Sequence, residues 1–134
     1  MFNKFLTSGD TLWVQAGNKL LFASNKDRLL PLLEYIEGLG HYHRSVVIFD
    51  KIMGNAAALL SIKANGREVY SPLGSQIAVR TLEKYGIRYH LNEIVPYIQK
   101  PGREEMCPME KLSLGKGPEE FYSAVKNKRK QARA

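Results

Sequence analysis

Two short stretches of the sequence carry side chains that could act together in a chemical step or in binding. Asp50 and Lys51 directly follow a run of apolar residues, and Gly54 and Asn55 come shortly after them. A carboxylate can orient a ligand or accept a proton. Free backbone N–H groups at a helix start, reinforced by a lysine, favour an anion such as phosphate. These residues are the first candidates for a binding site.

Further candidates stand where other predicted elements begin or end. Ser71 and His90 end two predicted strands, and Ser75 begins a predicted helix. The carboxyl ends of parallel strands meet at one edge of a sheet, where open α/β sheets form a ligand crevice. We therefore predict one cleft in which Asp50 is a catalytic candidate and the ligand is contacted by Lys51, Gly54, Asn55, Ser75 and His90. Simpler interpretations stay open: Asp50 can cap its own turn, and Lys51 can be solvated.

Cys107 is the only cysteine of the chain and lies in the stretch EEMCPMEKL, residues 104–112. Pro108 suits the first position of a helix, which predicts Cys107 at the N-cap. That position favours a reactive thiolate, and Asp50 or His90 could accept its proton. Nearby glutamates and two flanking methionines favour a buried, inert cysteine instead. Cys107 is thus a second catalytic candidate with an open alternative.

Metal and cofactor sites are not predicted. His41 and His43 flank Tyr42 at a spacing that suits one face of a strand, but they precede the apolar strand and so lie at the opposite edge from Asp50. A third ligand is missing there, and zinc sites need three or four. The N-terminus has no secretory signal and no stretch is long enough to span a membrane, which predicts a cytoplasmic protein.

The spacing of apolar residues predicts a ββαβαβαβ order over residues 11–91. Strands are expected at 11–16, 20–23, 45–49, 67–71 and 87–90, with helices over 24–40, 54–66 and 75–86. The first two strands flank a Gly17-Asn18 turn and form a hairpin. Helical crossovers between the later strands imply parallel neighbours. The fold class is a three-layer α/β/α domain with a mixed sheet of about five strands.

The whole chain, residues 1–134, is predicted to be one domain. Residues 1–10 form an N-terminal lead, 11–91 the α/β core, 92–125 a C-terminal helical layer broken by prolines, and 126–134 a basic tail. Of the formal net charge of +7, residues 126–133 contribute five positive charges, which leaves +2 for the body. The tail suits either a solvated helix end or contact with nucleic acid or an acidic partner.

The order of elements resembles the cytidine-deaminase-like fold. In zinc deaminases the helix after the hairpin begins with H-x-E, and the next strand-to-helix turn carries P-C-x-x-C. Here the corresponding stretches are SNKD and DKIMGNAAAL, with Lys51 and Gly54 at the cysteine positions. Because zinc needs thiolate or imidazole donors, the resemblance implies the fold without the zinc and without the deaminase reaction.

A closer resemblance covers roughly residues 10–125. The stretches VVIFDKIMGNAAALL, LEKYGIRYHLNEIVPYI and MCPMEK are similar to an uncharacterised family of small bacterial and archaeal proteins with that fold. The family implies no activity. We therefore expect a protein that binds a small anionic or nucleotide-like ligand at the carboxyl edge of the sheet. A Cys107-dependent enzyme and a module that binds nucleic acid through its basic tail are the alternatives.

Overall fold

The computed structural model of the chain describes residues 1–39 and 44–133. Within them lies a five-stranded sheet of order β2-β1-β3-β4-β5. Its strands are β1 (Leu12–Ala16), β2 (Lys19–Ser24), β3 (Val46–Asp50), β4 (Gly66–Ser75) and β5 (Arg88–Val95). β1 is antiparallel to β2 and β3, whereas β3, β4 and β5 are parallel. The predicted mixed sheet, with a hairpin at its edge and parallel central strands, is confirmed.

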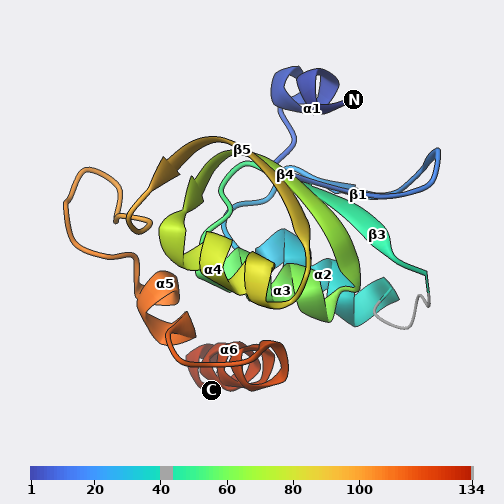
Figure 1. The fold of residues 1–134 in the computed structure, drawn as a ribbon. Coiled ribbons are helices and arrows are strands. Elements are labelled where there is room, and N and C mark those ends of the chain that lie inside the picture. The colour runs from blue at the N-terminus through green and yellow to red at the C-terminus, as the bar shows by residue number, and fades with distance from the viewer. Residues whose placement is uncertain (40–43, 134) are drawn as a thin grey trace.

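Helices lie on both faces of the sheet (Figure 1). α2 (Leu30–Leu39), α3 (Asn55–Lys63) and α4 (Gln76–Lys84) cover one face, as right-handed crossovers require. The opposite face carries α1 (Phe2–Ser8), in a segment for which only a lead was predicted. Phe5 of α1 is fully buried, and its ring lies 5.5 Å from that of Trp13 and 5.9 Å from that of Phe49. Aromatic burial therefore holds this helix on the sheet.

The C-terminal part packs on the outer side of α3. It contains α5 (Pro108–Ser113) and α6 (Pro118–Arg133), each of which begins at a proline as predicted. Since α2, α4, α5 and α6 all contact α3, this helix has no solvent-facing side over its first seven residues. Three consecutive alanines, residues 56–58, allow that close approach because their side chains add little volume.

β4 and β5 extend beyond their predicted ends. Ser71 and His90 consequently lie inside strands, and the prediction that they end strands is wrong; Asp50 does end β3. Pro72 does not stop β4 because the ladder to β3 has already ended at Phe49↔Tyr70, so no N–H is needed on that side.

Candidate ligand pocket at the carboxyl edge of the sheet

A cavity of about 670 Å³ opens at the carboxyl end of β3, which we call the carboxyl-edge pocket. Its walls come from four segments that are distant in sequence: the residue before β1, the segment just before α2, the β3–α3 turn together with the first turn of α3, and the segment that leads into α5. The lining residues are Thr11, Asp27, Arg28, Leu29, Asp50, Lys51, Ile52, Gly54, Ala56, Ala57, Ile98, Gln99, Lys100, Pro101, Arg103, Cys107, Pro108, Met109 and Glu110. The volume suits a small organic ligand.

Asp50 contributes a carboxyl group to the inner wall of this pocket. Its side chain is 7% exposed, and burial raises the pKa of the carboxyl from 3.8 to about 7. Hydrogen bonds from the backbone N–H groups of Ile52 and Lys51 lower the pKa but do not offset burial; the Ile52 nitrogen lies 3.4 Å from Oδ1. Asp50 therefore accepts hydrogen bonds within its own turn, as the capping interpretation predicted, but it does not cap α3. The N-cap of α3 is Gly54. Near neutral pH the group can donate or accept a proton.

Cys107 lines the same pocket as Asp50. It is the N-cap of α5, as predicted, and its backbone N–H donates to the Ile98 carbonyl at 2.8 Å. Its side chain is partly exposed rather than buried. The structure thus brings the two catalytic candidates to one cavity.

Three cationic side chains lie at the outer wall of the carboxyl-edge pocket. Arg28 and Arg103 are exposed, and Lys100 is partly exposed. The Lys100 ammonium lies 3.0 Å from a Glu105 carboxylate oxygen, and Arg103 lies 3.9 Å from the other oxygen. Arg28 adopts a left-handed backbone with φ of 61°, a conformation that side-chain-bearing residues rarely adopt. These three residues were not predicted from the sequence, because each comes from a loop whose path is set by tertiary contacts.

Lys51 belongs to the pocket by its position, but its ammonium is held elsewhere. Nζ donates to the Leu6 carbonyl at 3.1 Å and lies 4.8 Å from the centre of the Phe5 ring. Both partners are in α1, on the opposite face of the sheet. To contact a ligand as predicted, the Lys51 ammonium would have to leave the Leu6 carbonyl and the Phe5 ring, which hold it against α1.

The start of α3 is occupied by a carboxylate of the protein itself. Glu110 of α5 is 2% exposed, and its Oε1 accepts from the Asn55 backbone N–H at 2.5 Å, while Oε2 accepts from the Ile98 N–H at 2.7 Å. A carboxylate at a helix N-terminus is favourable because of the helix dipole. The prediction that this N–H group is free for a ligand anion is wrong, because Glu110 already binds it.

Gly54 allows Ile98 and Glu110 to approach the start of α3 closely. A Cβ atom at this position would lie 2.8 Å from Cγ1 of Ile98 and 3.0 Å from Oε1 of Glu110. Packing therefore requires a glycine here, and Gly54 lines the carboxyl-edge pocket with its backbone. It is one of the predicted ligand residues that do line the pocket.

Asn55 is buried behind the pocket in a network that joins three helices. Its Nδ2 donates to Ser113 Oγ of α5 at 2.9 Å, and its Oδ1 accepts from the Thr81 hydroxyl of α4. With 4% exposure the side chain does not line the pocket. The predicted ligand contact of Asn55 is replaced by a structural role.

Ser75 and His90 also lie away from the pocket. Ser75 is fully buried and caps α4 by accepting from the Ala78 N–H at 3.0 Å. His90 stacks on Tyr70 with ring centres 4.2 Å apart, and its Nε2 lies 2.7 Å from a Glu68 carboxylate oxygen. It points to the face that carries α1. The five predicted ligand residues therefore do not converge: only Lys51 and Gly54 line the pocket.

His41 and His43, which were considered as metal ligands and not predicted to bind a metal, lie outside the described residues together with Tyr42. Among residues 1–39 and 44–133, no group of three His, Cys, Asp or Glu side chains is arranged to hold a metal ion. In the same residues no helix is long and apolar enough to cross a membrane.

Comparison with known proteins identifies a family. The family model described as "TM1506: Domain of unknown function (DUF1893)" matches residues 1–129. The chain belongs to the DUF1893 family. It is similar to the crystal structure of a DUF1893 family protein, TM1506, from Thermotoga maritima, with a TM-score of 0.80 and 26% identity over 94% of this chain and 85% of that chain. No curated protein matches it. The DUF1893 chain thus has a family and a fold but no assigned activity.

Glu110 is the residue of the DUF1893 chain at the pocket whose role the sequence interpretation missed. It is the last residue of the MCPME stretch that carries the family resemblance, and it lies in the first turn of the predicted short helix. Both features pointed to a role beyond charge repulsion against Cys107. Its partners, however, are 55 and 12 residues away, so the role was not evident from local spacing.

Proposed function

We propose that this DUF1893 chain binds a small molecule with an apolar body and an anionic group in the carboxyl-edge pocket. The observation that carries the proposal is the placement of buried Asp50 on the inner wall of a cavity whose outer wall has Arg28, Lys100 and Arg103. An apolar cavity with a few convergent polar groups and a titrating carboxyl is the usual form of a ligand site.

The lining residues favour a planar, nucleotide-like ligand. Ala56, Ala57, Ile98 and Met109 offer apolar surface to a ring. A carboxyl group such as that of Asp50, with a pKa near 7, can donate to an acceptor on that ring or accept from a donor. The guanidinium groups at the outer wall suit a phosphate or carboxylate.

The proposal includes a cytidine-deaminase-like fold without zinc. Two observations support it: the strand order with an antiparallel β1, and the position of the pocket between the segment before α2 and the start of α3. In zinc deaminases these two helix starts carry the metal motifs. Here Asp27, Arg28, Asp50 and Gly54 stand in the corresponding segments, which suits hydrogen bonding to a ligand.

The test is an NMR titration with cytidine and adenosine 5′-monophosphates and with the two parent nucleosides. We expect saturable shifts of the Ile52, Ala56 and Cys107 amides. The monophosphates should bind more tightly than the nucleosides because only they reach the outer cations. The double variant Arg28→Gln/Arg103→Gln should remove that difference.

The matched control is Arg80→Gln/Arg88→Gln, which removes the same charge at exposed positions outside the pocket. It should leave the difference between monophosphate and nucleoside unchanged. The proposal is overturned if none of the four probes shifts the pocket amides at millimolar concentration. Equal losses in the two double variants would contradict the role of the outer cations.

A second candidate function, a Cys107-dependent enzyme, is favoured by the shared pocket of Cys107 and Asp50. In such a step the thiol transfers its proton to the Asp50 carboxylate, the sulfur adds to a carbonyl carbon of the substrate, and the electron pair of the C=O π bond moves to the carbonyl oxygen. Asp50 near its pKa of about 7 is suited to accept the proton.

Thiol labelling by iodoacetamide tests this function. If Asp50 assists the thiol, labelling should be faster in the parent protein than in Asp50→Asn, most clearly above pH 7 where the carboxylate forms. The Asp27→Asn variant, altered at an exposed residue of the same pocket, is the control. Identical labelling rates for the parent and Asp50→Asn across pH 6 to 9 would exclude base assistance by Asp50.

Contact of α6 with nucleic acid stays a prediction. Part of its charge has partners within the protein: Arg129 lies 2.9 Å from a Glu37 carboxylate oxygen, and Lys126 lies 5.2 Å from the centre of the Tyr122 ring. Removal of residues 126–134 should weaken binding to a single-stranded oligonucleotide and reduce its salt dependence if the tail makes that contact.

A further inference from the structure

A second concave site lies at the opposite end of β3, at the amino edge of the sheet. This amino-edge pocket has a volume of about 360 Å³ and is lined by Ala16, Gly17, Arg44, Ser45 and Arg67. β3 has five residues, so the two pockets are about 17 Å apart along the strand. They share no lining residue. The amino-edge pocket is therefore separate from the proposed ligand site.

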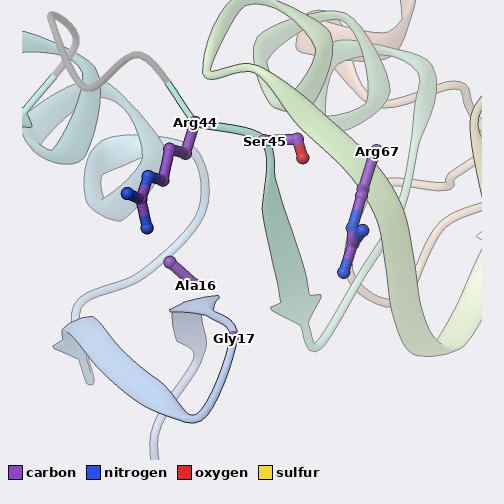
Figure 2. A pocket seen from close by; sticks show the side chains of 5 residues that line it. All are labelled: Ala16, Gly17, Arg44, Ser45 and Arg67. Carbon is purple, nitrogen blue, oxygen red and sulfur yellow. The ribbon is translucent and has the colours of Figure 1, made fainter.

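Three different elements bring the lining residues together (Figure 2). Ala16 ends β1 and Gly17 follows it in the β1–β2 turn, Arg44 and Ser45 directly precede β3, and Arg67 lies near the start of β4. Figure 2 shows Arg44 and Arg67 on either side of Ser45, with Ala16 facing the Arg44 side chain. Two guanidinium groups thus flank one small concavity.

Among the residues that the structure describes, no acidic side chain lines this pocket. Within residues 1–39 and 44–133 neither Arg44 nor Arg67 lies within 4.0 Å of a carboxylate, whereas Arg88, Arg103 and Arg129 each do. Two like charges beside one cavity, without a carboxylate to neutralise them, create a positive potential that attracts anions.

In the described part of the chain, Glu68 and Glu119 have partners other than these two arginines. Glu68 follows Arg67 in sequence, but its carboxylate contacts His90 and Tyr70 on the other face of the sheet. Across the hairpin, Lys19 pairs with Ala16 and adds a further cation near the pocket. Glu119 is engaged with Lys63 at the end of α3.

We propose that the amino-edge pocket binds the phosphate group of a small phosphorylated molecule. Guanidinium forks match phosphate oxygens by paired hydrogen bonds, so two arginines can contact several oxygens at once. The Ser45 hydroxyl can donate a further hydrogen bond. The volume, at the low end for ligand pockets, leaves room for a phosphate and a small organic group.

The test follows the arginine Nε–Hε signals by NMR while inorganic phosphate or phenyl phosphate replaces chloride at constant ionic strength. The Arg44 and Arg67 signals should shift together and saturate with both probes, and phenyl phosphate should bind at least as tightly as inorganic phosphate. Arg44→Gln/Arg67→Gln should weaken binding by about tenfold or more, since loss of one charge-assisted hydrogen bond already has that effect.

Two further variants separate the site from general charge and from folding. Arg80→Gln/Arg88→Gln lowers the net charge equally and should leave affinity within about twofold, because diffuse charge contributes little at constant ionic strength. Arg44→Lys/Arg67→Lys keeps the charge but loses the fork, and should bind less tightly than the parent. A thermal midpoint for each variant verifies that it is folded.

Several results would overturn the proposal. One is equal weakening by the Arg80/Arg88 double variant. Another is uniform shifting of all exposed arginine signals without saturation. Tighter binding of inorganic phosphate than of phenyl phosphate would point to the free ion instead of an ester. If a single-stranded oligonucleotide binds through Arg44 and Arg67 while phenyl phosphate does not, the site belongs to a polymer and the small-molecule assignment fails.

Discussion

The charged side chains at the two ends of β3 differ in their exposure and in their partners. At the carboxyl edge, Asp50 and Glu110 are 7% and 2% exposed, and Glu110 is bound to two backbone N–H groups. At the amino edge, Arg44 and Arg67 are exposed beside a small pocket, and none of its described lining residues is a carboxylate. The two buried carboxyl groups at the carboxyl edge are therefore tied to folding, whereas the two arginines at the amino edge have no carboxylate partner among the described residues.

The largest expected effect comes from Asp50→Asn. The folded-state pKa of about 7 exceeds the ordinary 3.8, so between these values the folded protein holds a proton that the unfolded chain has lost. Stability from this group is present below pH 4 and is lost as pH rises through 7, by about 4 kcal/mol in total. Asn cannot ionise, so Asp50→Asn does not lose folding stability as pH rises. At pH 8 this variant should be more stable than the parent protein.

Urea unfolding at pH 5 and pH 8 measures this effect. The advantage of Asp50→Asn over the parent should be larger at pH 8 than at pH 5. Asp27→Asn, at an exposed residue of the same pocket, should show no such change. If the stability of the parent does not fall relative to that of Asp50→Asn between pH 5 and 8, ionisation of Asp50 costs little folding free energy. That result would weaken the contrast between the two edges.

Glu110→Gln should destabilise the protein by about 3 kcal/mol. The amide keeps one acceptor oxygen but presents an NH₂ group to either the Asn55 or the Ile98 N–H, and the charge at the start of α3 is lost. Glu105→Gln, on an exposed carboxylate of the same segment, should cost less than about 1 kcal/mol. Chemical denaturation of the two variants compares them directly. Equal costs would contradict a structural role for Glu110.

Gly54→Ala should cost about 1–3 kcal/mol, because its Cβ would lie 2.8 Å from Ile98 and 3.0 Å from the Glu110 carboxylate. Gly38→Ala is the matched control. Gly38 lies in α2 with no atom within 4 Å of an added Cβ, so alanine should stabilise that helix by about 0.5–1 kcal/mol. Thermal midpoints of the two variants should therefore move in opposite directions. Movement in the same direction would contradict tight packing at the start of α3.

Arg44→Gln/Arg67→Gln should change stability least, by within about 0.5 kcal/mol. Removal of two nearby like charges should even stabilise the protein slightly at low salt, and this gain should vanish at high salt. Urea unfolding at two salt concentrations tests both statements. A large loss of stability would mean that these arginines hold the fold together, and the proposed division between the two edges would fail.

Much of the fold was predictable from local pattern. The continuous apolar run at residues 45–49 predicted a buried parallel strand, and Gly17-Asn18 predicted the hairpin turn. Pro108 and Pro118 correctly predicted the starts of two helices because proline suits the first helical turn. The predicted end of β4 was wrong because Pro72 is tolerated where β3 no longer pairs, and the predicted end of β5 was wrong because β5 continues to pair with this longer β4 as far as Val95.

The candidate site was predictable only in part. Asp50, Lys51, Gly54 and Cys107 line the carboxyl-edge pocket, as the strand order and the helix starts suggested. Asn55, Ser75 and His90 do not, because each is engaged in hydrogen bonds within the fold. Arg28 and Arg103 were missed because loops without periodicity carry no sequence pattern that predicts their direction.

The sequence by itself determined the class of the protein: a mixed sheet with helical crossovers, a carboxylate at the end of a buried strand, and a cysteine at a helix start. These features follow from local periodicity and from the backbone preferences of glycine and proline. Only the tertiary structure decided which charges are available. Glu110 reaches the start of α3 across 55 residues, and Arg44 and Arg67 line one pocket from the segment before β3 and from the start of β4, because side chains are paired or left unpaired by packing between distant segments.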